Sequence, residues 1–312
     1  MPSSTFNSET RRPPAGTRLN RATLSLLGCA VVVFLCIEGA ARFGLDRISR
    51  IHRRIVEETA EARDLTQPMD GGRRRILFVG NSLLLEDVDM NLLDTGLQSR
   101  YVVQRYAVEQ TYYLDWLYGL RGLFRHGMRP RTLVLCLNAP QLTGRAIRGD
   151  FSAHMLFDLQ DIWAAARDSG ADLTTTSGYY LAHYSAFYAT RAELRSVLMF
   201  RLAPSVVEMW HDAVTKRAVI PPDEQMVPVM AARFRQLREL CARYGAEFMF
   251  LVPPDRQPGD IAMLQAGEQS GVRVLRPIPN KALSLDYYRD GFHLNPKGAA
   301  VFTAALVKEM GK

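Results

Sequence analysis

Short apolar runs that alternate with longer helical patterns constrain the fold of this 312-residue chain most strongly. The first run, Ile76–Val79, is apolar at every position, as expected for a strand buried on both faces. Similar runs follow at Tyr101–Tyr106, Thr132–Leu137 and Glu247–Val252, and a fifth lies near Val272–Leu275. Strands that are separated by helices pair as parallel neighbours. The pattern therefore predicts an α/β fold of the flavodoxin-like, three-layer type around a parallel sheet.

The helical segments between these runs have recognisable ends. One covers Glu224–Tyr244 and stops at Gly245, and a shorter one covers Asp260–Glu268. Pro296 stands where the last helix would begin, and the following residues to Met310 complete it. In such a fold the residues that directly follow the strands meet on one rim of the sheet, where α/β proteins bind their ligands.

Two short motifs, 208 residues apart, supply a serine, a histidine and a carboxylate. Ser82 ends a Gly-Asn-Ser motif directly after the first strand. Asp290 and His293 belong to an Asp-Gly-Phe-His motif before the final helix. Acyl transfer through a serine requires a base to take the hydroxyl proton and a carboxylate to fix the tautomer of that base. We therefore expect Ser82, His293 and Asp290 to be the catalytic residues.

These motifs resemble those of the SGNH/GDSL family of serine esterases and acyltransferases. The first block of that family is a strand followed by Gly-(Asp/Asn)-Ser, and its last block is Asp-x-x-His. The resemblance implies a catalytic triad of Ser82, Asp290 and His293 that works without a cofactor. The third block of the family places an oxyanion-binding asparagine after a central strand, and Asn138 follows the run that begins at Thr132. We therefore expect that the Ser82 backbone amide and the Asn138 side chain form the oxyanion hole.

The second block departs from the family pattern. In the family it contributes a glycine whose backbone amide helps to bind the oxyanion, but the stretch from Tyr101 to Tyr118 contains no glycine. We expect a backbone amide near Gln110 or Thr111 to take that place.

A metal site is not predicted. Asp87, Asp89 and Asn91 have the spacing of a calcium-binding loop, but Leu92 and Gln98 stand where such a loop needs glycine and glutamate. The four cysteines include no Cys-x-x-Cys pair, and no Cys/His group has the spacing of metal ligands.

The positive charge of the chain is concentrated near its N-terminus. The net charge is +7, and residues 1–54 hold nine arginines and three acidic residues, so the rest of the chain is close to neutral. This distribution argues against a nucleic-acid partner. The arginines flank an apolar segment, Ala22–Ala41, whose only charge is Glu38. Twenty helical residues span about 30 Å, which is the thickness of the hydrocarbon layer of a membrane.

We expect this segment to anchor the protein in the inner (cytoplasmic) membrane by a single pass, with the folded domain extracytoplasmic or periplasmic. The expected divisions are a cytoplasmic tail over 1–21, the anchor over 22–42, a stalk or linker over 43–72 and the α/β domain over 73–312. A cleaved secretory signal is the alternative, with Gly39 and Ala41 as the small residues before the cut. Both interpretations export the domain.

Residues 141–223 interrupt the alternation of strands and helices and are predicted to form a helical insertion rich in aromatic residues, among them Tyr179, Tyr180, Tyr184 and Tyr188. One interpretation is an accessory core, because aromatic side chains tend to be buried. The other is a lid, or a surface that docks on a membrane or a partner beside the rim.

The resemblance implies a membrane-anchored serine esterase or O-acyltransferase. Anchored members of the family add or remove acyl groups, commonly acetyl, on envelope glycans, and some work beside a multi-spanning membrane acyltransferase. The expected partners are therefore an acylated glycan or other ester, the membrane and such an acyltransferase. Two alternatives stay open, a non-catalytic anchored module of a glycan-acylation complex and a lipid esterase.

Overall fold

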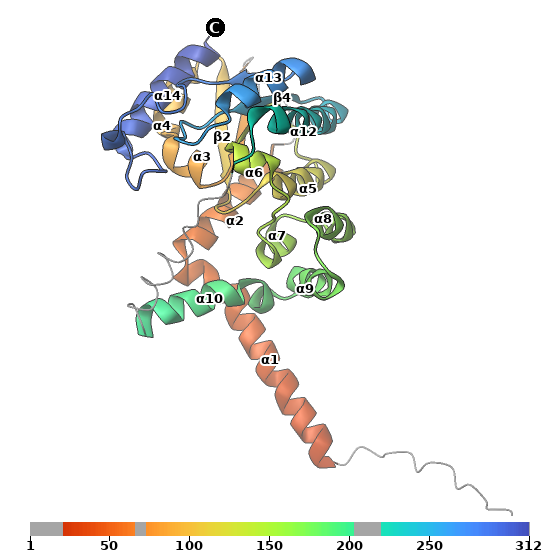
Figure 1. The fold of residues 1–312 in the computed structure, drawn as a ribbon. Helices are drawn as coiled ribbons and strands as arrows, with labels where there is room; N and C mark the ends of the chain where they lie inside the picture. The colour runs from red at the N-terminus through yellow and green to blue at the C-terminus, as the bar shows by residue number, and fades with distance from the viewer. Residues whose placement is uncertain (1–20, 66–72, 203–219, 312) are drawn as a thin grey trace, which may run out of the picture.

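The computed structural model describes residues 21–65, 73–202 and 220–311. At its centre is a five-stranded sheet in which every neighbouring pair is parallel, in the order β2-β1-β3-β4-β5 (Figure 1). The strands are β1 (Arg74–Gly80), β2 (Tyr101–Ala107), β3 (Thr132–Cys136), β4 (Glu247–Leu251) and β5 (Arg273–Leu275). The predicted α/β fold is confirmed, and the five predicted strands match those observed to within two residues at each end.

Helices cover both faces of the sheet, because the central strands bury side chains on both sides. In β1, Ile76 and Phe78 pack on one face, and Leu77 and Val79 pack on the other. The first face is covered by α3 (Ser82–Asp87), α4 (Met90–Leu97) and α14 (Pro296–Met310). The second face is covered by α2 (Arg50–Arg63), α5 (Tyr113–Arg125), α12 (Asp223–Arg243) and α13 (Asp260–Ser270). These layers are the three layers that the sequence predicts.

In its described part the predicted insertion consists of helices joined by short loops, and its residues 203–219 lie outside the described ranges. Its elements, together with the helix that follows β3, are α6 (Ala139–Thr143), α7 (Asp150–Met155), η1 (Leu159–Asp161), α8 (Ile162–Ser169), α9 (Leu173–Tyr184) and α10 (Ala186–Leu202). Tyr179 joins the main core, with Tyr180 and Tyr188 packed against it, whereas Tyr184 is exposed. Some of the aromatic residues of the insertion therefore belong to the core, and others face the solvent.

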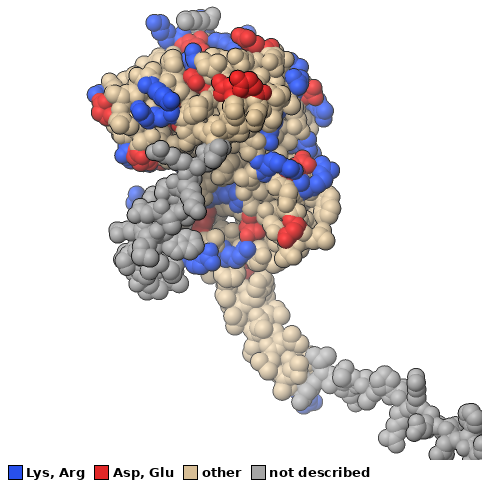
Figure 2. All heavy atoms as spheres, viewed as in Figure 1, with Lys and Arg blue, Asp and Glu red and all other residues tan. Residues whose placement is uncertain are grey.

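The N-terminal apolar segment forms one long helix, α1 (Arg21–Ile48). Within it, Arg21–Gly44 is long and apolar enough to cross a membrane, with a mean hydropathy of 2.2 over its most apolar window, and a signal sequence would meet the same criterion. The predicted anchor over 22–42 falls within this range. Figure 2 shows α1 projecting from the domain as an uncharged stretch that ends in a basic side chain at its free end. Residues 1–20 of the expected tail lie outside the described ranges.

Helix α2 occupies the region that we expect to be a stalk. A single residue, its N-cap Ser49, separates it from α1, and it packs on the domain rather than standing free of it. Ile55 and Ala62 are fully buried in the main core, and Glu58 accepts a hydrogen bond from the Ala107 backbone N–H at 2.8 Å. The helix is mostly polar in sequence, but it has one apolar face, and this face is buried. The expected hinge at 66–72 lies outside the described residues.

Candidate active site

Ser82 is the first residue of α3, immediately beyond the carboxyl end of β1. Gly80 is required there because a Cβ atom at this position would lie 2.6 Å from the Cys136 carbonyl oxygen of the neighbouring strand. Asn81 is the N-cap of α3, and its Nδ2 donates to the Thr111 carbonyl oxygen at 3.0 Å. These contacts hold the serine at the rim, between the ends of β1 and β2.

The structure brings the three predicted triad residues together. The Ser82 Oγ lies 3.0 Å from the His293 Nε2, and the His293 Nδ1 lies 2.8 Å from the Asp290 Oδ2. The other oxygen of Asp290 accepts the backbone N–H groups of Phe292 at 2.9 Å and of His293 at 2.7 Å. The carboxylate therefore fixes both the backbone of the loop and the imidazole ring. A proton on Nδ1 leaves Nε2 as the acceptor that faces the serine.

The electrostatics of the loop favour an ionised Asp290. Burial would raise the pKa of Asp290, but hydrogen bonds from the His293 ring and from the backbone N–H groups of His293 and Phe292 outweigh it. The net effect holds the pKa of Asp290 well below its ordinary value. The side chain of His293 is 18% exposed and that of Asp290 is 43% exposed, so a substrate can reach the ring while water screens part of the carboxylate charge.

Helix α3 also holds the loop that carries the base. The Asp87 Oδ1 accepts the Leu294 backbone N–H at 2.7 Å, and Glu86 forms an ion pair with Arg289. Burial raises the pKa of Asp87 well above its ordinary value. The helix that begins with Ser82 thus ends with two residues that bind either side of His293.

Asn138 lies two residues beyond the end of the neighbouring strand β3, as Ser82 lies two residues beyond the end of β1. Gly80 pairs with Cys136, so Ser82 and Asn138 each stand two residues beyond a paired position. The Asn138 Oδ1 caps α6 by accepting the Gln141 N–H at 3.1 Å, which orients the amide group. Its Nδ2 donates to the Asp255 Oδ2 at 2.9 Å. An amide nitrogen has two hydrogens, so one remains for a second acceptor.

The second-block loop between β2 and α5 lies against Asn81. Its Gln110 has a positive φ of 59°, a conformation that is uncommon for a residue other than glycine and that often occurs at functional sites. Thr111 is fully buried and held by the Trp116 Nε1, which donates to its Oγ1 at 3.0 Å. The loop therefore reaches its sharp turn through a non-glycine residue. The expectation of an oxyanion donor at Gln110 or Thr111 stays a prediction.

Two buried carboxylates at this rim are not part of the predicted site. Asp255 follows β4 and is 2% exposed; burial raises its pKa, while hydrogen bonds from the Gln257 backbone N–H and the Asn138 side chain act in the opposite direction. The sequence contains a usable signal, because Val252-Pro-Pro-Asp255 places a polar residue just beyond a strand end. Asp87 shows no comparable signal, since its role depends on a backbone N–H more than 200 residues away.

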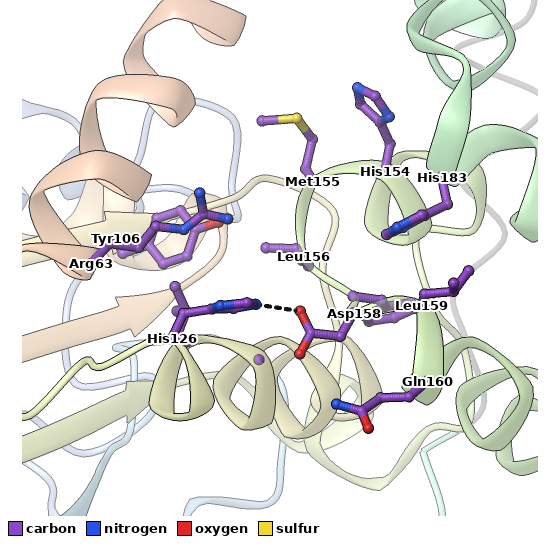
Figure 3. Close-up of a pocket in the computed structure, with 13 residues that line it drawn as sticks. Arg63, Tyr106, His126, His154, Met155, Leu156, Asp158, Leu159, Gln160 and His183 are labelled. Atoms are coloured by element: carbon purple, nitrogen blue, oxygen red, sulfur yellow. Dashed lines mark hydrogen bonds and ion pairs between the residues drawn. The ribbon is translucent and has the colours of Figure 1, made fainter.

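Ser82, Asp290 and His293 do not line the cavity that Figure 3 shows. That cavity, of about 600 Å³, lies between α2, α5 and the start of the insertion, and its lining includes Arg63, His126, His154 and His183 but no triad residue. His126 is directed at Asp158, 2.9 Å away (Figure 3). In the described part of the chain, no group of three or more His, Cys, Asp and Glu side chains is placed to hold a metal ion.

Comparison with known proteins gives fold-level likenesses only. No family model matches the chain, and no curated protein matches it. The crystal structure of TesA is 11% identical over 76% of this chain and 98% of that chain, with a TM-score of 0.38. The crystal structure of the YxiM protein from Bacillus subtilis is 12% identical over 77% of this chain and 56% of that chain, with a TM-score of 0.36. Such scores carry no argument about activity, which rests on the geometry of the rim.

The fold and the rim define a class of protein. The chain is a parallel α/β protein in which a serine at the end of β1 meets an Asp-x-x-His loop before the last helix. This is the fold and the arrangement that the resemblance to the SGNH/GDSL family implies.

Proposed function

We propose that this protein is a membrane-anchored serine esterase or O-acyltransferase that works through an acyl-enzyme on Ser82. One observation carries the proposal, the continuous hydrogen-bond chain from the Ser82 Oγ through the His293 ring to Asp290, with distances of 3.0 and 2.8 Å. Both distances lie within the range for a nucleophile, a general base and its orienting carboxylate.

The reaction begins when the His293 Nε2 takes the proton of Ser82 as the oxygen attacks an ester carbonyl. Asp290 accepts the Nδ1–H and stabilises the imidazolium. Collapse of the tetrahedral intermediate breaks the bond to the leaving alcohol, which receives the proton from Nε2. Water in an esterase, or a second hydroxyl in a transferase, then attacks the acyl group as the His293 Nε2 takes its proton. The bond between the acyl group and the Ser82 Oγ breaks, and the proton returns from Nε2 to Oγ.

Two donors are proposed for the oxyanion of the intermediate. The Ser82 N–H belongs to the first turn of α3, where backbone N–H groups have no acceptor within the helix. The second hydrogen on the Asn138 Nδ2 is the other donor. Donors of this type each contribute about 3 kcal/mol to transition-state stabilisation.

A glycan substrate is supported by a cavity beside the second-block loop. It measures about 770 Å³ and is lined by Gln110, Tyr112, Tyr179, Arg191 and Asp150, among others. Arg191 and Asp150 are paired at 2.8 Å, so these two charges neutralise one another. Aromatic rings with paired charges suit a neutral polyhydroxylated ligand, so the proposed substrate is an acylated, most simply acetylated, glycan of the cell envelope.

The first test is fluorophosphonate labelling of the full chain in detergent, read by mass spectrometry of the labelled peptide. Ser82 should be labelled, and labelling should be lost in His293→Ala and Ser82→Ala, while Ser284→Ala serves as a serine control outside the triad. A folded protein that is not labelled at Ser82 would instead support the non-catalytic module.

A further inference from the structure

The only charged residue inside the apolar run Ala22–Ala41 is bound to the insertion. Glu38 accepts hydrogen bonds from the Ser185 Oγ at 2.7 Å, the Ala186 N–H at 2.8 Å and the Phe187 N–H at 3.1 Å. These groups form the start of α10, where backbone N–H groups need an acceptor and the helix dipole favours a negative charge. Glu38 therefore serves as the cap of a helix that lies about 150 residues further along the chain.

A second residue of α1 binds the end of the preceding helix. Arg42, one turn after Glu38 and 3.2 Å from it, donates to the carbonyl oxygen of Tyr184, the last residue of α9, at 3.0 Å. Ala41 and Ala186 are both buried against each other. The junction of α9 and α10, residues 184–187, is thus tied to α1 by charge-assisted hydrogen bonds and by packing. We refer to it as the α9–α10 corner.

The position of Glu38 along α1 determines how far the α9–α10 corner lies from the start of the candidate membrane span. Glu38 lies 17 residues after Arg21, the first residue of the candidate span, which corresponds to about 26 Å along a helix. A hydrocarbon layer is about 30 Å thick. If α1 crosses the membrane from Arg21, the α9–α10 corner lies at the opposite boundary of the layer, where polar headgroups meet acyl chains.

Helix α9 carries an exposed apolar stripe that ends at this corner. Leu173, Leu181 and Tyr184 are 75%, 49% and 62% exposed, and their spacing of eight and three residues places them on one face of the helix. Leucine and tyrosine on one face of a helix parallel to the membrane are typical of an interfacial segment. Figure 1 shows α9 and α10 as the part of the domain nearest to the free length of α1.

The catalytic rim faces the same way. Helices α3 and α6, which begin at Ser82 and Ala139, lie on the side of the sheet toward α10 and α1, and the C-terminus lies at the opposite end (Figure 1). A surface that fixes α9 on the membrane would therefore direct the rim toward the bilayer.

We propose that the α9–α10 corner and the stripe of Leu173, Leu181 and Tyr184 form a membrane-contact surface that holds the Ser82 rim over the bilayer. Resting on the proposed function, the proposal adds that the ester substrate is carried at the membrane surface, for example on a lipid-linked chain. The contact itself needs no catalysis and is tested separately.

The contact is measured by tryptophan quenching in vesicles of phosphatidylcholine that contain brominated acyl chains. The full chain is reconstituted as Leu181→Trp and, as a control, as Gln98→Trp, because Gln98 is also exposed but follows α4 at the far end of the sheet. An interfacial side chain lies about 5–10 Å into the boundary, so the added fluorescence of Leu181→Trp should be quenched roughly threefold more than that of the control. Equal quenching of the two would overturn the proposal.

The substrate part is tested with Leu173→Ser/Leu181→Ser, two surface changes that leave the core intact. Hydrolysis of a lipid-tailed ester in vesicles should fall roughly tenfold, whereas hydrolysis of soluble p-nitrophenyl acetate should be unchanged, because only the contact of the domain with the interface is altered. Equal activity of variant and parent on the vesicle ester refutes this part. If the parent hydrolyses neither ester and is not labelled at Ser82, the proposed function fails, and the quenching result still decides the contact.

Discussion

Replacing Asp290 by asparagine should invert the tautomer of the His293 imidazole. Two backbone N–H groups, those of Phe292 and His293, point at one oxygen of Asp290, so the amide oxygen of the variant takes that place. Its NH2 group then faces the His293 Nδ1, which must accept a hydrogen bond and cannot carry the proton. The proton moves to Nε2, which faces the Ser82 Oγ at 3.0 Å and can no longer take the serine proton.

The size of the loss follows from the exposure of the carboxylate. Loss of the charge-assisted hydrogen bond to the imidazolium removes about 1.5–3 kcal/mol, or roughly 10–150-fold in rate. The wrong tautomer adds to this, and a fully buried triad carboxylate is worth about 10⁴-fold. Asp290 is 43% exposed, so water screens part of the interaction between its charge and the imidazolium. We therefore expect kcat/KM to fall by about 10³-fold.

The assay is hydrolysis of p-nitrophenyl acetate by the full chain, with circular dichroism to check folding. Asp286→Asn is the matched control, since Asp286 is an exposed aspartate of η2 (Leu285–Tyr287) in the same segment and does not contact His293 in any described hydrogen bond. Asp290→Asn that retains activity within tenfold of the parent, or Asp286→Asn that loses as much, would refute the tautomer argument.

Three further outcomes follow from buried contacts. Gly80→Ala should lower the free energy of unfolding by about 1–3 kcal/mol in urea denaturation, because its Cβ would meet the Cys136 carbonyl oxygen at 2.6 Å; an unchanged midpoint would contradict the close approach. Asn138→Ala should lower kcat by roughly 10²-fold with the fold intact, and unchanged turnover would remove Asn138 from the oxyanion hole. Burial raises the pKa of Asp115 to about 6, above an unfolded value of about 3.9. The folded state therefore binds the extra proton, and the free energy of unfolding should fall by up to about 3 kcal/mol as the pH rises from 4 to 7, a slope that Asp115→Asn should reduce.

Much of the fold could be predicted from local patterns. The strands are short and mostly apolar, so their positions and their parallel pairing follow from sequence alone, and the serine and histidine motifs stand where strand and helix ends place them. Burial of α2 could not be predicted in this way. Its apolar face is reduced to a few residues such as Ile55 and Ala62 among charged ones, and only contact with the core shows its role.

The parts of the site that were missed depend on contacts between distant residues. The amide of Asn138 is shared with Asp255, which lies 117 residues away, and no local pattern pairs them. Glu38 reads in the sequence as an isolated charge in an apolar segment, and its partners at 185–187 are known only from the fold. Secondary structure is encoded locally, whereas hydrogen-bond partners at a rim are set by the order of the strands.

The short helix α3 has a consequence for how the protein opens and closes. It begins with Ser82 and ends with Asp87, which holds the loop of His293 through the Leu294 N–H. Nucleophile and base therefore belong to a single cooperative unit, although they are far apart in the chain. Hydrogen exchange of α3 and of the 290–294 loop should report one common opening free energy, so the protein would switch between an assembled and a dismantled site without populating a half-formed one.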